Sequence, residues 1–160
     1  MEETVVPLLT AHGGGFEQKR VCQFVVFLEN RVGRLQKLVQ VFEESTAKIV
    51  GLAVEESSEA ALVRLISSDS KVARKVLEDH GFAFGQTDLI AVELPENTTS
   101  PLSAICTVLL RAEINIHSAH PLLVAPKLPT IALYVDEPTF AGQILIRKGF
   151  KLIGESDLNL

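Results

Sequence analysis

Residues 29–35, Glu29-Asn30-Arg31-Val32-Gly33-Arg34-Leu35, separate an apolar run from a helical pattern. Before them, residues 21–28 (VCQFVVFL) are β-branched and aromatic, which predicts a strand buried on both faces. After them, one face of a helix is predicted by apolar residues at helical spacing: Leu35, Leu38, Val39 and Phe42. Residues 29–35 are therefore expected to form a loop that joins a strand to the start of a helix.

The remainder of the first half continues this alternation. Further strands are predicted at 48–55, at 61–66 and from 82–84 onward. Between the last two, Asp69 or Ser70 is suited to cap a second helix, which ends at His80-Gly81. The resulting order of elements is βαββαβ, the ferredoxin-like arrangement.

The second half repeats the first. Strands are predicted at 89–94, 114–123, 131–135 and 150–153, and helices over 102–109 and 139–147. Glu96-Asn97-x-x-Ser100-x-Leu102 lies over Glu29-Asn30-x-x-Gly33-x-Leu35 at a shift of 67 residues. The helix end Gly149-Phe150 lies over Gly81-Phe82 at a shift of 68. Matches of this kind predict an internal duplication.

The duplication predicts an α+β fold of two tandem ferredoxin-like βαββαβ domains packed side by side. Their sheets are expected to be antiparallel, with helices on one face. We place the first domain at 20–87 and the second at 88–160, after a flexible N-terminal arm at 1–19. Domains of this size bury little surface alone, so we expect them to pack against each other or against a second chain.

Charge and composition exclude several classes of protein. The net charge is −5, and the 15 Lys and Arg residues are scattered rather than gathered in a stripe, which argues against nucleic-acid binding. No apolar stretch approaches the roughly 20 residues that cross a bilayer, so no membrane partner is expected. Cys22 and Cys106 lie in apolar segments without CxxC spacing and predict a reducing, cytoplasmic location.

The loop at 29–35 has the chemistry of a small-ligand site. A helix start offers unpaired backbone N–H groups and a positive dipole end, which suit a carboxylate. Gly33 lets a ligand approach the backbone, and the Asn30 side chain can accept a hydrogen bond from an ammonium group. Together they would hold both ends of an α-amino acid. The same residues also fit a structural role, in which Asn30 caps the helix and Gly33 eases the turn.

The repeated βαββαβ order, with Glu-Asn-Arg-x-Gly-x-Leu after the first strand, resembles the ACT domain, a module that binds amino acids in regulated metabolic enzymes. The loop motif is similar to that of the serine-binding domain of phosphoglycerate dehydrogenase. The resemblance covers residues 20–160, and without an attached catalytic domain the chain is similar to the small stand-alone tandem ACT proteins of bacteria. It implies a regulatory protein that binds an amino acid and is not an enzyme, with no cofactor and no metal.

In that family, ligands lie between paired domains, held by the first loop of one and the second strand of its neighbour. The resemblance implies a composite site made of these residues: Asn30, Arg31, Val32, Gly33, Arg34 and Leu35 of the first domain, and Asn115 of the second. A second site would use Asn97 and Ser100 against Lys48, but there a serine replaces the glycine and a lysine replaces the strand asparagine. Asn115 also fits a structural role as a turn residue before a strand.

Other candidate groups predict structure rather than chemistry. His117 and His120 are three apart on a predicted strand, so they should point to opposite faces and make poor metal partners unless the strand is bulged. Cys106 falls on the predicted inward face of its helix and is expected to be a core residue rather than a nucleophile. No group of residues resembles an active site.

The expected function is ligand-linked regulation, in which a bound amino acid stabilises one orientation of two domains. The expected partners are an amino acid ligand, a second copy in a homodimer and a metabolic enzyme. The alternative is the regulatory subunit of an amino-acid biosynthetic enzyme such as acetolactate synthase. Small polar, branched-chain and aromatic amino acids all stay open as ligands, as does a role in assembly without any ligand.

Overall fold

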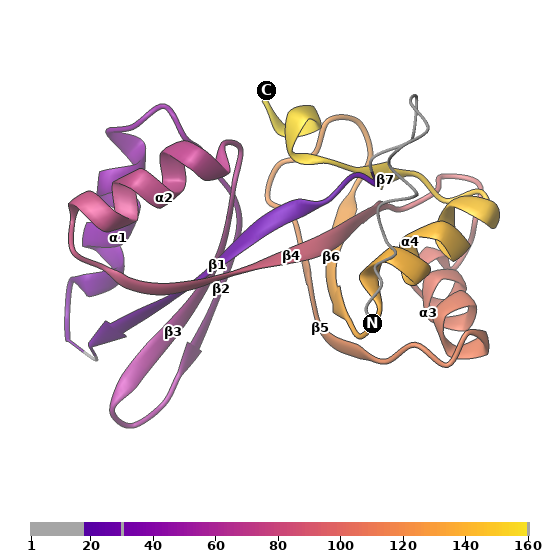
Figure 1. The fold of residues 1–160 in the computed structure, drawn as a ribbon, viewed down its shortest axis with the longest axis horizontal. Helices are drawn as coiled ribbons and strands as arrows, with labels where there is room; N and C mark the ends of the chain where they lie inside the picture. Colours follow the sequence, from indigo (N-terminus) through magenta and orange to yellow (C-terminus); the bar gives the residue numbers. More distant parts are fainter. Residues whose placement is uncertain (1–17, 30, 160) are drawn as a thin grey trace, which may run out of the picture.

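The computed structural model describes residues 18–29 and 31–159. The first set of elements is β1 (Val21–Glu29), α1 (Arg34–Glu43), β2 (Ile49–Glu56), β3 (Ala60–Ser67), α2 (Ser70–Asp79) and β4 (Ala83–Glu93). The second is α3 (Pro101–Arg111), β5 (Ile116–Pro121), β6 (Thr130–Val135), α4 (Pro138–Arg147), β7 (Leu152–Ile153) and the short 3₁₀ helix η2 (Glu155–Leu158). The predicted order of strands and helices is confirmed in both halves (Figure 1).

One strand belongs to both domains, which the sequence did not predict. β4 is continuous over Ala83–Glu93, whereas separate strands were expected at 82–84 and 89–94. Residues 83–89 pair with β1, and residues 90–93 pair with β6. The strand order is therefore β2-β3-β1-β4-β6-β5, with β7 also paired to β4. The two predicted sheets form one seven-stranded antiparallel sheet through this strand.

The expected domain limits can be placed on this arrangement. The limit between residues 87 and 88 falls inside β4, so each domain contains part of this strand. The expected arm at 1–19 lies outside the described residues as far as position 17. Gln18 and Lys19 rest on the second domain, where the Gln18 amide donates to the Thr139 carbonyl oxygen and the Lys19 ammonium donates to Asp157.

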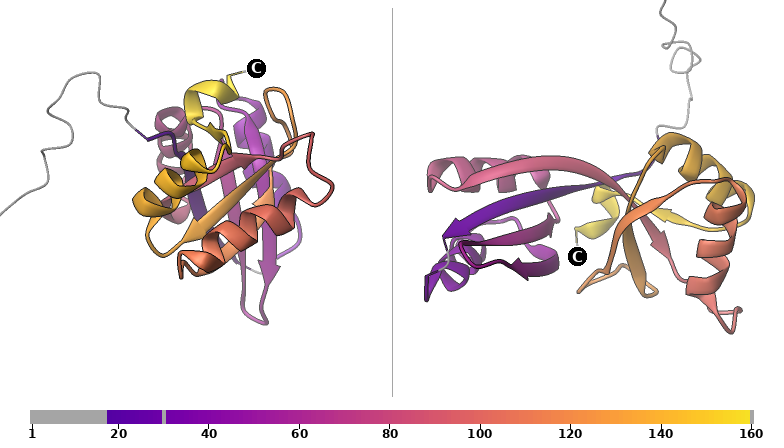
Figure 2. Two further views of the ribbon diagram at one scale, coloured as in Figure 1. Left: turned by 90° about the vertical axis from the view of Figure 1, so that its right-hand side faces the viewer. Right: turned by 90° about the horizontal axis from the view of Figure 1, so that it is seen from below.

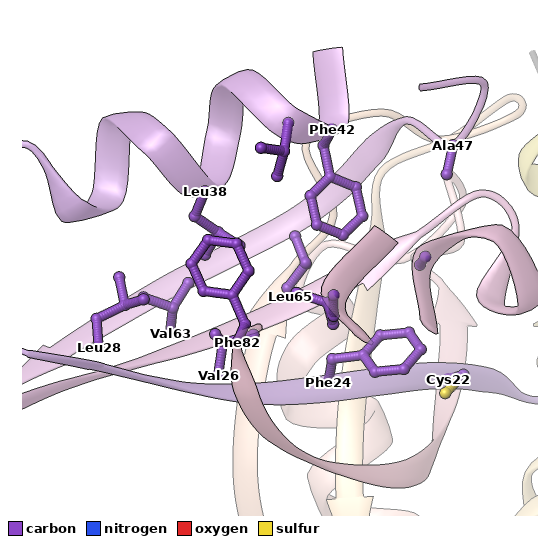
Figure 3. Close-up of a cluster of buried hydrophobic side chains, with 13 residues drawn as sticks. Cys22, Phe24, Val26, Leu28, Leu38, Phe42, Ala47, Val63, Leu65 and Phe82 are labelled. Carbon is purple, nitrogen blue, oxygen red and sulfur yellow. The ribbon is translucent and has the colours of Figure 1, made fainter. Parts of the chain in front are cut away.

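The first domain has its core between the sheet and helices α1 and α2. Alternate residues of β1, such as Phe24 and Val26, point toward the helices, as the period of a strand requires. Leu38 and Phe42 of α1 meet them from above, and Phe82 closes the cluster before β4 (Figure 3). All five side chains are buried.

The second domain repeats this core with its own helices. Ile90 and Val92 of β4 face α3 and α4, which supply Ile105, Leu109 and Leu145 to the same cluster. Pro101 and Pro138 open these two helices, and a missing N–H group costs nothing at a first helical position. Among the residues that the structure describes, no helix is long and apolar enough to cross a membrane.

A third apolar core joins the two domains where their helix-free sheet faces meet. Its buried members are Val21, Val50, Ile66, Leu89, Ala91, Ala132, Ile153 and Leu158, with Leu122 packed against them. These residues come from strands of both domains and from η2. In Figures 1 and 2, η2 lies between the two domains, and its Leu158 belongs to this core.

Hydrogen bonds also hold the domains together around that core. The backbone N–H of Leu123 donates to the carbonyl oxygen of Val50 at 2.7 Å. On the other side, the Glu155 carboxylate accepts from the backbone N–H and, at 3.1 Å, from the hydroxyl of Ser70 at the start of α2. A carboxylate is stabilised at a helix N-terminus, so Glu155 ties the C-terminal segment to the first domain.

Candidate functional site

Two open grooves lie on the outer sides of α1 and α3. The first has a volume of about 620 Å³ and is lined by Leu35, Gln36, Val39, Gln40 and Glu43. The second has a volume of about 380 Å³ and is lined by Ser103, Cys106, Thr107, Leu109, Leu110, Ile114, Asn115 and Ile116. Each groove therefore contains a residue that the sequence assigned to the ligand site, Leu35 in one and Asn115 in the other.

The grooves occupy equivalent places in the two repeats. At the shift of 67 residues, the matched lining pairs are Gln36 with Ser103, Val39 with Cys106, Gln40 with Thr107, and Glu43 with Leu110. The duplication has thus kept one surface feature in each domain, at the helix that follows the first strand.

The helical faces predicted to point inward were partly wrong at these positions. Cys106 is exposed rather than buried, and Leu102 and Leu35 are 51% and 38% exposed. The buried residues of α3 are Ile105 and Leu109, which leave Cys106 on the flank of the helix. The error recurs in both repeats because the inward face of each helix is narrower than the apolar spacing predicts.

The loop before α1 is described at every residue except Asn30, which lies outside the described residues. Val32 is fully exposed, and Arg31 is exposed beside Glu29, with 3.0 Å between Nε and the carboxylate. Gly33 is the N-cap of α1 and has φ of 86° and ψ of −6°, in the left-handed region. A residue with a Cβ is strained there, which explains the glycine.

The side chain of Arg34 is half-buried at the start of α1. Its guanidinium carbon lies 5.8 Å from the centre of the Phe82 ring, in cation–π range. Its Nε atom is buried and has no hydrogen-bond partner among the described residues. A charged donor in this position at the start of a helix suits an anionic group.

The first turns of α1 and α2 are capped differently. The Asp69 side chain accepts from the backbone N–H groups of Lys71 and Val72, which confirms the predicted cap of α2. Glu155 adds a second carboxylate at the same place. At α1, Gly33 offers no side chain to its own helix, so the first turn there can receive a carboxylate from outside the chain.

Asn115 lies just before β5, where its backbone is fixed by Asp136. The Asn115 N–H donates to the Asp136 carboxylate at 3.1 Å, and the Asp136 N–H donates to the Asn115 carbonyl oxygen at 3.2 Å. His117 Nε2 also contacts the Asp136 carboxylate. Asp136 therefore positions Asn115 at the groove, a role for which the sequence carried no signal because the two residues are 21 positions apart.

The residues of the expected second site are less suited to bind a ligand than those at the start of α1. Ser100 is the N-cap of α3 with φ of −137°, so its backbone lacks the left-handed turn of Gly33. Asn97, Ser100 and Lys48 are exposed. Asn97 and Ser100 lie between β4 and α3, and Lys48 precedes β2 in the other domain.

The loop at 31–35 and Asn115 lie far apart in one chain. Val21 of β1 pairs with Leu89 at the junction of the domains, whereas Glu29 is eight residues further along, roughly 26 Å at the rise of a strand. Asn115 lies beyond the junction in the second domain. Figures 1 and 2 show α1 and α3, which border the two grooves, at opposite ends of the molecule.

Titratable groups do not assemble an active site around either groove. No cluster of His, Cys, Asp and Glu that could hold a metal ion occurs within residues 18–29 and 31–159. Burial raises the pKa of the Cys22 thiol to about 12, with a further contribution from Asp88, so this thiol stays protonated inside the first core.

The strand that carries His117 and His120 is irregular. The register of β5 with β6 shifts between Ile116 and Ser118, beside His117.

Comparison with known proteins identifies the fold. Protein BT0572 from Bacteroides thetaiotaomicron superposes with a TM-score of 0.79 at 24% identity, over 88% of this chain and 96% of that one. The ligand-free regulatory subunit of aspartate kinase from Thermus thermophilus gives a TM-score of 0.53 at 12% identity, over 82% and 93%. No curated protein sequence matches this chain. Residues 19–160 match the family model of the ACT domain pair, and the chain belongs to that family.

Proposed function

We propose that this chain is a regulatory protein that binds an amino acid between two copies of itself. As an ACT domain pair it has a ligand-binding regulatory role, and the amino acid and the site are our proposal. The observation that carries the proposal is the start of α1, where Gly33 has φ of 86° and no side chain among the described residues caps the first helical turn. The protein fills the matching place on α2 with two carboxylates of its own, Asp69 and Glu155.

We place the carboxylate of the ligand at this helix start and its ammonium group at the side chains of Asn30 and Asn115. Arg34 supplies an additional charged donor through its Nε atom, which has no hydrogen-bond partner within the described part of the chain. Asn115 presents its side chain from a backbone that Asp136 holds in place. The helix start and Arg34 match the carboxylate of an α-amino acid, and the side chains of Asn30 and Asn115 match its ammonium group.

A second copy of the chain is required because one chain keeps the two halves of this site apart. The terminal strands of the sheet are β2 and β5, one in each domain. The parts of these strands beyond the Leu123–Val50 hydrogen bond have an edge that favours pairing with another chain. Apolar side chains beside the grooves, including Leu102 at 51% and Leu110 at 75% exposure, favour the same pairing. We therefore propose a homodimer in which the α1 groove of one copy faces the Asn115 groove of the other.

The second set of residues, Asn97 and Ser100 with Lys48, is proposed as a weaker site of the same dimer. Ser100 adds a side chain where Gly33 has none, and Pro101 removes one of the N–H groups at the helix start. The same carboxylate therefore meets fewer donors at α3 than at α1. Binding is expected to fill the α1 sites first.

A metabolic enzyme is the proposed target of this regulation. The fold is shared with a regulatory subunit of aspartate kinase, which supports a partner enzyme as the object of control. Affinity capture of the full chain from its own cells, with and without the bound amino acid, tests this part. Capture of one large enzyme of amino-acid metabolism supports the proposal, and capture of no enzyme in either condition contradicts it.

A thermal-shift screen against the twenty amino acids tests the function. One or a few of them are expected to raise the melting temperature, since saturation at 100 times the Kd stabilises a protein by about 2.7 kcal/mol. The shift is expected to disappear in Asn30→Ala and to persist in Asn97→Ala, the matched asparagine of the second repeat. An amino acid that shifts Asn30→Ala as much as the wild type contradicts the site, and the absence of any shift contradicts amino acid binding.

A further inference from the structure

His120 is a buried histidine at the junction of the domains. His120 on β5 pairs with Ala132, a member of the interdomain core, so both side chains point to the helix-free face. The side chain of His120 is 8% exposed, and its Nε2 atom has no partner among the residues described. Three residues later, the Leu123 N–H donates across the junction to the Val50 carbonyl oxygen at 2.7 Å.

The charged and titratable groups around His120 do not neutralise an imidazolium. Arg64 of β3, in the other domain, is close enough to act on it electrostatically. Arg64 is itself engaged by the Glu55 carboxylate of β2 at 3.3 Å. Tyr134 of β6 lies on the same face as Ala132 and carries no carboxylate that could pair with an imidazolium. Protonated His120 would therefore be a second cation near Arg64, and the two charges would repel each other.

We propose that protonation of His120 opens the contact between the two domains, which makes the ACT domain pair responsive to acid. A buried cation without a hydrogen-bonded partner is costly, and the cost is relieved when the ring reaches water. Opening separates β5 and the segment around Leu123 from the first domain. β4 still connects the domains because it is paired within each of them.

The direction of the effect follows from the protonation equilibrium. Burial lowers the pKa of His120, and the charge of Arg64 lowers it further. The closed contact is therefore fully stable above the ordinary histidine value of about 6.5 and is lost as the pH falls through the lowered pKa.

Amide hydrogen exchange on the full chain at pH 8 and pH 5.5 tests the proposal. After correction for the intrinsic exchange rate, the protection of the Leu123 amide is expected to fall several-fold at pH 5.5, while the amides of β3 keep theirs. The fall is expected to persist in His80→Gln, an exposed histidine on α2, and to vanish in His120→Gln. An equal fall in His120→Gln, no fall in the wild type, or a joint loss at Leu123 and β3 overturns the proposal.

An NMR titration of His120 in the unmodified protein tests the proposal without relying on the folding of a variant. The imidazole of His120 in the unmodified protein is expected to titrate below about pH 6.5, the ordinary value, when followed by NMR. The chemical shift of the Leu123 amide is expected to follow the same curve. Titration of His120 at the ordinary value, or a Leu123 amide that does not respond to it, contradicts the proposed switch.

Discussion

Replacing Leu89 with alanine is expected to lower the free energy of unfolding by about 2–5 kcal/mol, the range for a buried leucine truncated in a well-packed core. Leu89 is 1% exposed and sits in the interdomain core, at the position where β4 passes from one domain to the other. Its side chain packs with residues of both domains. The cavity therefore weakens both at once, and chemical denaturation followed by circular dichroism measures the loss.

The control for this variant is Leu110→Ala. Leu110 is 75% exposed on α3, and surface substitutions usually change stability by less than about 0.5 kcal/mol. Because the two domains share β4 and a core, each variant is expected to unfold in one transition. A loss below about 1 kcal/mol in Leu89→Ala, or two separate transitions in the wild type, contradicts the shared core described above.

Replacing Gly33 with valine is expected to cost about 1–2 kcal/mol of stability through backbone strain alone, since an L-residue is disfavoured in the left-handed region. No atom lies within 4 Å of the place that a Cβ would take at Gly33, so steric contact among the described residues adds nothing to the cost. The same change places a branched side chain at the helix start that receives the ligand. The amino-acid-dependent thermal shift is therefore expected to be lost as well.

Gly85→Val is the matched control for that change. A Cβ at Gly85 would also have no described atom within 4 Å, but Gly85 lies in β4 without a positive φ. A β-branched residue suits a strand, so this variant is expected to be as stable as the wild type or more so. A Gly33→Val protein that keeps both its stability and its ligand response would show that the loop does not form the site.

The repeat and the element order could be predicted because they depend on local signals. Apolar alternation marks the strands, Asp69 caps α2 as its position suggests, and Gly33 occupies the left-handed turn that its place before a helix requires. The family resemblance is confirmed over 19–160 by the domain-pair match. The strands, the Asp69 cap and the Gly33 turn can each be recognised within a few residues of sequence, and the repeat follows from comparing such segments along the chain.

The shared strand could not be predicted in this way. Residues between the two expected strands are polar or lack a side chain, as at Gly85 and Asp88, and such residues usually mark a loop. Here they continue the ladder because Cys22 and Val25 of β1 lie opposite them in the same sheet. Pairing with a distant strand has overridden the local preference.

The grooves and the position of Asn115 escaped prediction for a related reason. The spacing of Leu102 and Cys106 fits an inward face, but the packing of α3 against α4 and the sheet leaves both residues exposed. The family resemblance placed the Asn30 loop and Asn115 in one composite site. It did not show that the α1 and Asn115 grooves are separate in one chain, because that depends on how β4 joins the domains.

A heterodimer of two inactive variants is the most direct test of a site shared between copies. One chain carries Asn30→Ala and the other Asn115→Ala, each with its own affinity tag, so that co-expression and two purification steps isolate the mixed dimer. In the proposed arrangement, one of its composite sites carries both substitutions and the other carries neither. Calorimetry then measures binding of the amino acid that the thermal-shift screen identifies.

The mixed dimer is expected to bind this amino acid with the wild-type Kd and half the wild-type stoichiometry, while neither variant homodimer reaches that affinity. This result would establish that Asn30 of one copy and Asn115 of the other form a single site. A mixed dimer that binds no better than the variant homodimers would contradict the shared site, and with it the central claim that regulation by this ACT domain pair operates between two chains.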